Sequence, residues 1–201
     1  MATSRGLSPG SVARAAVACL AVVLASRVTP AQAAQAPDLA QYGYRHVLAT
    51  VHLQPGQTAR ITVPDAYSAG KAMGYATITV PAGAFTVPVK FEVLAGSHQH
   101  WQALAPKGLV AIANFAYRVT DTATGQRIAA FHAAVTYSVR DAMVAKDSVY
   151  WATTATSPAK FLDASPHTAI DGDVLTHPQM TANVGWVITT PKADLMKSPS
   201  M

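Results

Sequence analysis

The sequence predicts an all-β protein, an antiparallel β-sandwich, and two observations carry that prediction. Segments of alternating apolar and polar residues recur from Tyr44 to Thr190, and clusters of Gly, Pro and Asp separate them. No stretch of this region holds its apolar residues at helical spacing. Seven or more short strands without helices between them are typical of a sandwich or a barrel, and the uneven spacing favours a sandwich.

The first expected strand, 46–53, shows the pattern clearly. Every second residue is apolar, which predicts that this face packs on the core. These residues are Val47, Ala49, Val51 and Leu53. Further strands are expected at 58–63, 75–80, 85–94, 109–119, 128–139, 148–153 and 183–190.

Two connections have the composition of hairpin turns. One is 120–126, which contains Gly125, and the other is Asp171-Gly172 between two short apolar runs. Glycine adopts a positive φ at little cost, so both segments predict antiparallel pairing of the strands that flank them. Asp173 follows the second turn, but the pair of aspartates lacks the further oxygen ligands of a calcium loop.

The N-terminus predicts a secretory signal peptide over residues 1–33. Arg5 and Arg14 precede an apolar run at 15–25, and the small residues of 30–33 resemble a cleavage site. An uncleaved membrane anchor would need roughly 20 apolar residues, more than this run contains. A lipoprotein modified at Cys19 would leave almost no apolar core before the cysteine. We therefore expect a secreted, extracellular protein with no membrane span after signal removal.

The expected mature chain is nearly balanced in charge. Cleavage removes three of the 15 basic residues and none of the 10 acidic ones, which leaves a net charge of +2. No run of Lys or Arg suggests binding to nucleic acid or to anionic lipid. The single cysteine lies in the signal peptide, so burial of apolar residues must stabilise the mature domain without disulfides.

The mature chain is expected to form one domain. Residues 34–43 are predicted to be a linker, 44–190 the β-sandwich and 191–201 a disordered tail.

Several short motifs in residues 74–190 carry a family resemblance. They are the segment ITVPAGAF at 78–85, VPV at 87–89, the strand at 131–139 and VGWVI at 184–188. With these motifs the chain resembles secreted bacterial β-sandwich modules related to ZU5 and immunoglobulin-like domains. The resemblance implies that the Pro-x-Gly-Ala turn links two core strands and that the domain is an adhesive or structural unit. Self-cleaving members have a His-Phe-Ser type site, and this sequence contains no Phe-Ser pair.

The segment 97–101 suggests a metal site. His98 and His100 are two residues apart, and on an extended segment both side chains point to the same side. Neutral imidazoles bind zinc or copper, and His132 or His177 could supply a third ligand. The alternative is a polar loop that contains two histidines by chance and is anchored by Trp101.

Two further polar residues are expected to face solvent from strands. His132 lies between Phe131 and Ala133, which belong to the apolar face of their strand, so an outward position is favoured. Glu92, the only glutamate, alternates with Phe91 and Val93 in the same way.

Common catalytic and nucleotide-binding motifs are missing from this sequence. It has no Gly-x-Ser-x-Gly elbow, phosphate loop or dinucleotide fingerprint. An enzyme acting on a polysaccharide would need two carboxylates in one groove, drawn from Asp141, Asp147 and Asp163 in separate loops.

Aromatic residues are candidates for a ligand-binding face. Tyr150 and Trp151 are neighbours on a strand, so one ring must point to each face of its sheet, and an exposed ring can stack on a sugar or a peptide. We therefore expect a non-enzymatic extracellular module, structural or for interaction, whose partner is a protein or a glycan at the cell surface. The alternative is a secreted zinc- or copper-binding domain that uses His98 and His100.

Overall fold

The computed structural model describes residues 36–64 and 74–195. The predicted signal peptide and residues 196–201 of the predicted tail lie outside the described residues. None of the helices in the described part of the chain has the length and apolar character needed to span a membrane.

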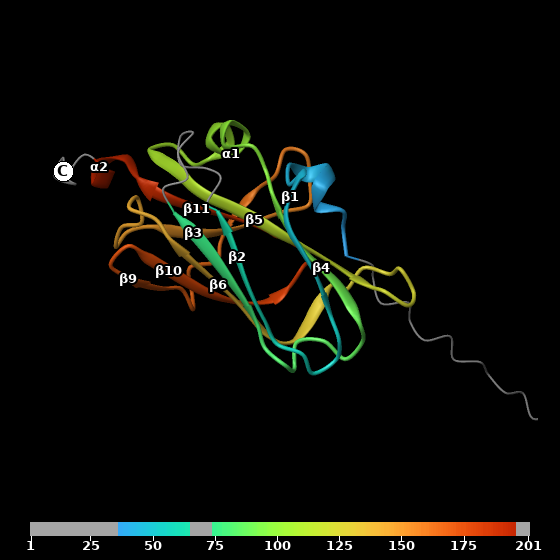
Figure 1. The fold of residues 1–201 in the computed structure, drawn as a ribbon. Helices are drawn as coiled ribbons and strands as arrows, with labels where there is room; N and C mark the ends of the chain where they lie inside the picture. Colours follow the sequence, from blue (N-terminus) through green and yellow to red (C-terminus); the bar gives the residue numbers. More distant parts are fainter. Residues whose placement is uncertain (1–35, 65–73, 196–201) are drawn as a thin grey trace, which may run out of the picture. The chain divides into compact units, whose positions relative to one another are not determined.

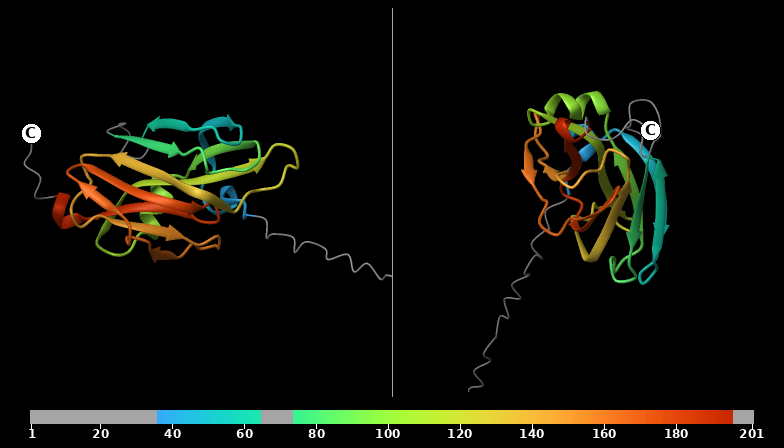
Figure 2. Two further views of the ribbon diagram at one scale, coloured as in Figure 1. Left: turned by 90° about the horizontal axis from the view of Figure 1, so that it is seen from below. Right: turned by 90° about the vertical axis from the view of Figure 1, so that its left-hand side faces the viewer.

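The described chain forms two antiparallel sheets that pack face to face (Figures 1 and 2), which confirms the all-β sandwich. The six-stranded sheet has the order β1 (His46–Leu53), β4 (Val89–Ala95), β5 (Leu109–Asp121), β11 (Gly185–Pro191), β7 (Val149–Thr153) and β8 (Phe161–Asp163). The five-stranded sheet has the order β2 (Ala59–Pro64), β3 (Tyr75–Val80), β6 (Ala130–Arg140), β10 (Val174–Thr181) and β9 (Ala169–Asp171).

The main core fills the space between the sheets and is rich in aromatic rings. Phe115 of β5 stacks on Tyr137 of β6 with 3.6 Å between ring centroids, so the two sheets meet directly at this pair. Trp186 of β11 stacks on the same phenylalanine at 5.3 Å. All three side chains are buried, and large rings of this kind contribute much of the apolar area that stabilises a core.

Short helices and a second apolar cluster cover the outer face of the six-stranded sheet. The helices are the 3-10 helix η1 (Leu39–Tyr42) and α1 (His98–Leu104). Because side chains alternate along a strand, the residues beside those of the main core point outward, and several of them are buried here. This outer cluster consists of Leu39, Tyr44, Leu94, Trp101, Ala111, Ala116 and Val187.

The alternation predicted for 46–53 is wrong at Val47, the first of the residues expected to face the core. The pairing of β1 with β4 shifts by one residue between Val47 and Ala49. A bulge of this kind moves the preceding side chain to the other face, and Val47 is 48% exposed. Leu48 contacts the main core in its place, together with Val51.

One of the two expected hairpins forms only at its turn. Asp121 N donates to Gln126 O at 2.9 Å and Ile128 N donates to Val119 O at 2.8 Å, after which the chain leaves the six-stranded sheet. The next strand, β6, pairs in the other sheet, so 120–126 is a crossover between layers. The turn at Gly172, where φ is 57°, does join the antiparallel pair β9 and β10 as predicted.

Both predicted flanks of the domain contain ordered structure. Within the expected linker, Leu39 is buried, and Arg127 holds Asp38 in an ion pair of 3.1 Å. At the other end, β11 extends to Pro191 and is followed by the short helix α2 (Lys192–Leu195). Apolar contacts therefore extend into the segment expected to be a linker, and strand pairing extends to Pro191.

Candidate binding groove

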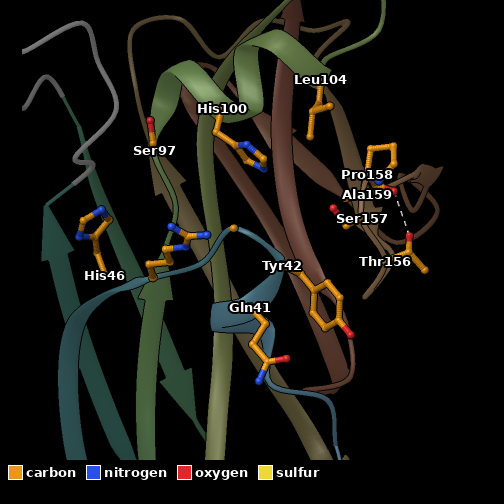
Figure 3. A pocket seen from close by; sticks show the side chains of 12 residues that line it. Gln41, Tyr42, His46, Ser97, His100, Leu104, Thr156, Ser157, Pro158 and Ala159 are labelled. Carbon is orange, nitrogen blue, oxygen red and sulfur yellow. Dashed lines mark hydrogen bonds between the residues drawn. The ribbon is translucent and has the colours of Figure 1, made fainter.

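Three segments that are distant in sequence enclose a groove of about 510 Å³ beside the outer cluster (Figure 3). The segments are the chain from η1 into β1, the helix α1 and the loop between β7 and β8. The lining residues are Gln41, Tyr42, Gly43, Arg45, His46, Ser97, His100, Leu104, Thr156, Ser157, Pro158 and Ala159. In Figure 3, His100 points from α1 toward the hollow, and Tyr42 lies across from the loop residues.

Gly43 brings the first segment close to α1. It ends η1 with φ 109°, a left-handed conformation that glycine adopts at low cost. A Cβ atom at this position would lie 2.9 Å from His100 Nε2 and 3.0 Å from a ring carbon of Trp101. The floor of the groove between η1 and α1 therefore requires glycine for two reasons, the backbone angle and the contact.

Trp101 fixes α1 on the sheet. The side chain is fully buried, and its ring centroid lies 4.6 Å from that of Tyr44 and 6.2 Å from that of Phe161. Gln102 adds two hydrogen bonds to β5, because its Nε2 donates to Leu109 O at 3.2 Å and its Oε1 accepts from Ala111 N at 2.9 Å. These contacts hold the wall that carries His100 in a defined position.

Tyr44 connects the first segment to the far strands of the same sheet. Its hydroxyl lies 2.8 Å from Thr153 Oγ1 and donates to Trp186 O at 3.3 Å. A Cβ atom on Gly185 would overlap the tyrosine ring at 2.1 Å, so this strand position requires glycine as well. The segment that contributes Tyr42 and Arg45 is thus anchored at its centre.

The loop between β7 and β8 is held by its own hydroxyl groups. Thr156 Oγ1 donates to Pro158 O at 3.1 Å and lies 2.7 Å from Thr154 Oγ1. Thr154 Oγ1 also accepts from Lys160 N at 2.9 Å. This wall of the groove is preorganised, which reduces the entropic cost of ordering the loop when a ligand binds.

The lining combines an aromatic ring, several hydrogen-bonding groups and one permanent positive charge. Arg45 is exposed and, among the described residues, forms no ion pair. Gln41, Ser97 and Ser157 have side chains without a hydrogen-bond partner within the described part of the chain. The lining includes no Asp or Glu, so these groups can bind a ligand but do not supply the pair of carboxylates used for glycoside cleavage.

The predicted metal ligands do not share one side of an extended segment. His98 and His100 lie in α1, where residues two apart point about 200° from each other. His100 lines the groove, whereas His98 is half-buried, with Nδ1 lacking a hydrogen-bond partner in the described residues. Metal binding by the pair stays a prediction, but the geometry on which it was based is wrong.

The two candidate third ligands lie elsewhere. His132 is exposed on β6 of the other sheet, as expected. His177 on β10 is 8% exposed. Its Nδ1 forms a hydrogen bond of 2.9 Å with Thr168 Oγ1, and its ring stacks on that of Tyr150 with 4.1 Å between the ring centroids. Within residues 36–64 and 74–195, no group of three or more His, Cys, Asp or Glu side chains is placed to hold a metal ion.

Glu92 is buried, which corrects the expectation of a solvent-facing position. Arg118 lies opposite it on β5 and donates two hydrogen bonds, of 2.7 and 3.1 Å, to its carboxylate. Lys90 Nζ lies 2.9 Å from the same carboxylate. The hydrogen bonds from Arg118 are the main cause of a lowered pKa of Glu92, and they outweigh the opposing effect of burial.

The three aspartates considered for catalysis stand outside the groove lining. Asp163 accepts a 2.9 Å hydrogen bond from Ser165 N, which lowers its pKa. Asp141 is buried and accepts a 2.7 Å hydrogen bond from Met143 N, while Asp147 is exposed. Asp163 and Asp141 are thus explained by hydrogen bonds within their own turns.

Tyr150 and Trp151 do point to opposite faces of their sheet. Tyr150 is fully buried in the main core, and Trp151 is half-buried on the outer face, where its Nε1 donates to Thr189 Oγ1 at 2.8 Å. Neither ring lines the groove. The aromatic side chain at the groove is instead Tyr42, which is half-buried.

No family model matches the chain, and no curated protein matches it. The resemblance to ZU5 and immunoglobulin-like modules therefore stays a prediction. The chemistry of the groove residues is the remaining basis for assigning a function.

Proposed function

We propose that this chain is a secreted, non-enzymatic β-sandwich that acts as an interaction module outside the cell. It binds a glycan or a protein partner through the groove between η1, α1 and the β7–β8 loop. One observation carries the proposal. Tyr42, Arg45 and polar side chains that have no hydrogen-bond partner among the described residues line one preorganised hollow whose lining has no carboxylate.

The resemblance described above supports the proposal at the level of the fold. In the observed chain, the segment at 81–88 joins β3 of one sheet to β4 of the other, and both Ala84 and Phe85 are buried. A turn that links two core strands is what the ZU5- and immunoglobulin-like modules imply. We propose this relationship as the origin of the scaffold, and the groove as the feature specific to this chain.

Binding to a panel of cell-surface glycans and secreted proteins tests the proposal, with Tyr42→Ala as the groove variant. We expect the substitution to weaken binding about tenfold, because an aromatic contact contributes on the order of 1 kcal/mol beyond its buried area. Titration calorimetry on the secreted protein gives the affinities.

Tyr75→Ala is the matched control. Tyr75 is 61% exposed on β3, in the sheet that does not carry the groove, so its removal should leave the affinity unchanged. A Tyr75→Ala variant that loses binding while Tyr42→Ala retains it would place the binding face on the other sheet. Absence of binding across the whole panel would contradict an interaction module.

A further inference from the structure

We infer that the groove binds a carboxylated sugar, such as a uronic acid residue of an acidic glycan. This inference rests on the proposed function and specifies the ligand class. It is carried by the charge of Arg45 in the groove lining, by polar lining side chains that have no hydrogen-bond partner among the described residues and by the position of Tyr42 (Figure 3).

Within the described part of the chain, no carboxylate pairs with the positive charge at the groove. Arg118 on β5 and Arg127, which follows the crossover 120–126, are already paired with Glu92 and Asp38. Arg45 has no such carboxylate among the described residues, and the groove lining offers none. A guanidinium group matches a carboxylate through two parallel hydrogen bonds, and this geometry is specific for a planar anion.

The remaining lining groups suit the hydroxyl groups and the ring of a sugar. Gln41, Ser97 and Ser157 can each donate and accept hydrogen bonds without breaking a bond within the described protein. Tyr42 packs partly against the outer cluster, and its contribution to the groove lining gives the apolar C–H face of a sugar an aromatic surface to contact. A simple inorganic anion would use Arg45 but would leave these groups without a partner.

The size of the groove favours a glycan segment over a folded protein. Its volume of about 510 Å³ lies within the range of roughly 300–1,000 Å³ that is usual for small-molecule sites. Stable protein interfaces instead bury surfaces of about 800 Å² on each partner and are not confined to one hollow. One or a few units of an acidic sugar carry a carboxylate, a ring and several hydroxyl groups. These groups match the guanidinium, the aromatic ring and the polar side chains in the groove lining.

Titration with an oligogalacturonate and with its methyl ester tests the inference, because the two ligands differ in the charge of the carboxyl group. We expect the acid to bind about tenfold more tightly than the ester, equivalent to about 1.4 kcal/mol. Raising the salt concentration should reduce this preference, because the ion pair is partly exposed. Arg45→Gln should abolish the preference while leaving the circular dichroism spectrum and the melting temperature unchanged.

Arg60→Gln is the control for charge alone. Arg60 is exposed on β2 of the other sheet, and its loss changes the net charge by the same amount as Arg45→Gln. The preference for the acid should survive in this variant. If Arg60→Gln and Arg45→Gln reduce the preference equally, the attraction is general and the inference is overturned.

The remaining outcomes separate this inference from the proposed function. Equal affinity for acid and ester, lost in Tyr42→Ala, would overturn the carboxylate inference and retain a sugar-binding groove. Tighter binding of a sulfated oligosaccharide than of the oligogalacturonate would overturn it in the same way. Binding of a secreted protein alone, also lost in Tyr42→Ala, would exclude the sugar and retain the interaction module. Failure of all these ligands would remove both.

Discussion

At the scale of single residues, His177 carries a pH dependence built into the main core. The ring is buried between the sheets, stacks on Tyr150 and hydrogen-bonds to Thr168. Burial lowers its pKa from 6.5 to about 4, with a smaller contribution from the nearby His167. The folded protein therefore holds this imidazole neutral at pH values where the unfolded chain protonates it.

The stability contributed by a neutral His177 should be complete above about pH 6.5 and should fall as the pH approaches 4. Between pH 7 and pH 5 the expected loss in the free energy of unfolding is about 2 kcal/mol, since a tenfold difference in proton affinity is worth about 1.4 kcal/mol. His177→Phe keeps an aromatic ring and removes the titration, so its loss over this interval should be about 2 kcal/mol smaller. Urea denaturation at the two pH values measures the difference.

His132→Phe is the matched control for this prediction. His132 is exposed on β6, so the variant should retain the pH dependence of the unmodified protein. An identical pH dependence in His177→Phe would show that the buried imidazole is not the group responsible.

Other residue positions show what the sequence could not reveal. An outward position for Glu92 followed from alternation alone, but Arg118 is brought opposite it by pairing between strands 26 residues apart, and this pairing makes burial possible. Arg45 and Tyr42 carried no local signal of binding, because the other walls of the groove come from residues near 100 and 157. Sites assembled from distant segments need the fold before they can be recognised.

At the scale of elements, the strands were largely predictable and the helices were not. The alternating runs at 75–80 and 148–153 correspond closely to β3 and β7. The helix α1 is only seven residues long, too short to show a helical period, and it owes its stability to the burial of Trp101. Ser97 at its N-cap, with Trp101 and Leu104 three residues apart, is the weak signal that could have suggested it.

The paired strands β4 and β5 share one buried charged contact, between Glu92 and Arg118, whose contribution to stability can be tested. Glu92→Gln should lower the free energy of unfolding by about 2 kcal/mol at neutral pH, because Arg118 loses a buried, charged hydrogen-bond partner. The pKa of Glu92 is lowered by folding, so this contribution is present above its ordinary value of 4.5 and is lost as the pH falls through the lowered value. Chemical denaturation at pH 7 gives the difference.

Asp173→Asn is the comparison for the effect of burial. Asp173 and Arg140 are 3.9 Å apart with both side chains at least half exposed, so removing this charge should change stability by less than about 0.5 kcal/mol. Equal effects of the two substitutions would contradict a special role for the buried contact.

At the scale of the whole molecule, the sandwich has two outer faces, and the outer cluster covers that of the six-stranded sheet. The main core between the sheets holds most of the large buried rings, and this part of the account follows from the hydrophobic pattern. The outer cluster was not predicted, because Leu94, Ala116 and Val187 resemble ordinary members of buried strands and only the structure shows what covers them. That cover positions the walls of the groove on one face of the molecule.

Mapping of amide chemical shifts by NMR during titration with oligogalacturonate is the most direct test of this account. The perturbed amides should cluster at Gln41–His46, at α1 and at 156–159, and they should saturate with one affinity. Amides of β2 and β3, on the opposite sheet, should remain unchanged. Saturable shifts confined to β2 and β3, or no saturable shifts with this or any other ligand of the panel, would contradict the assignment of the groove as the binding site.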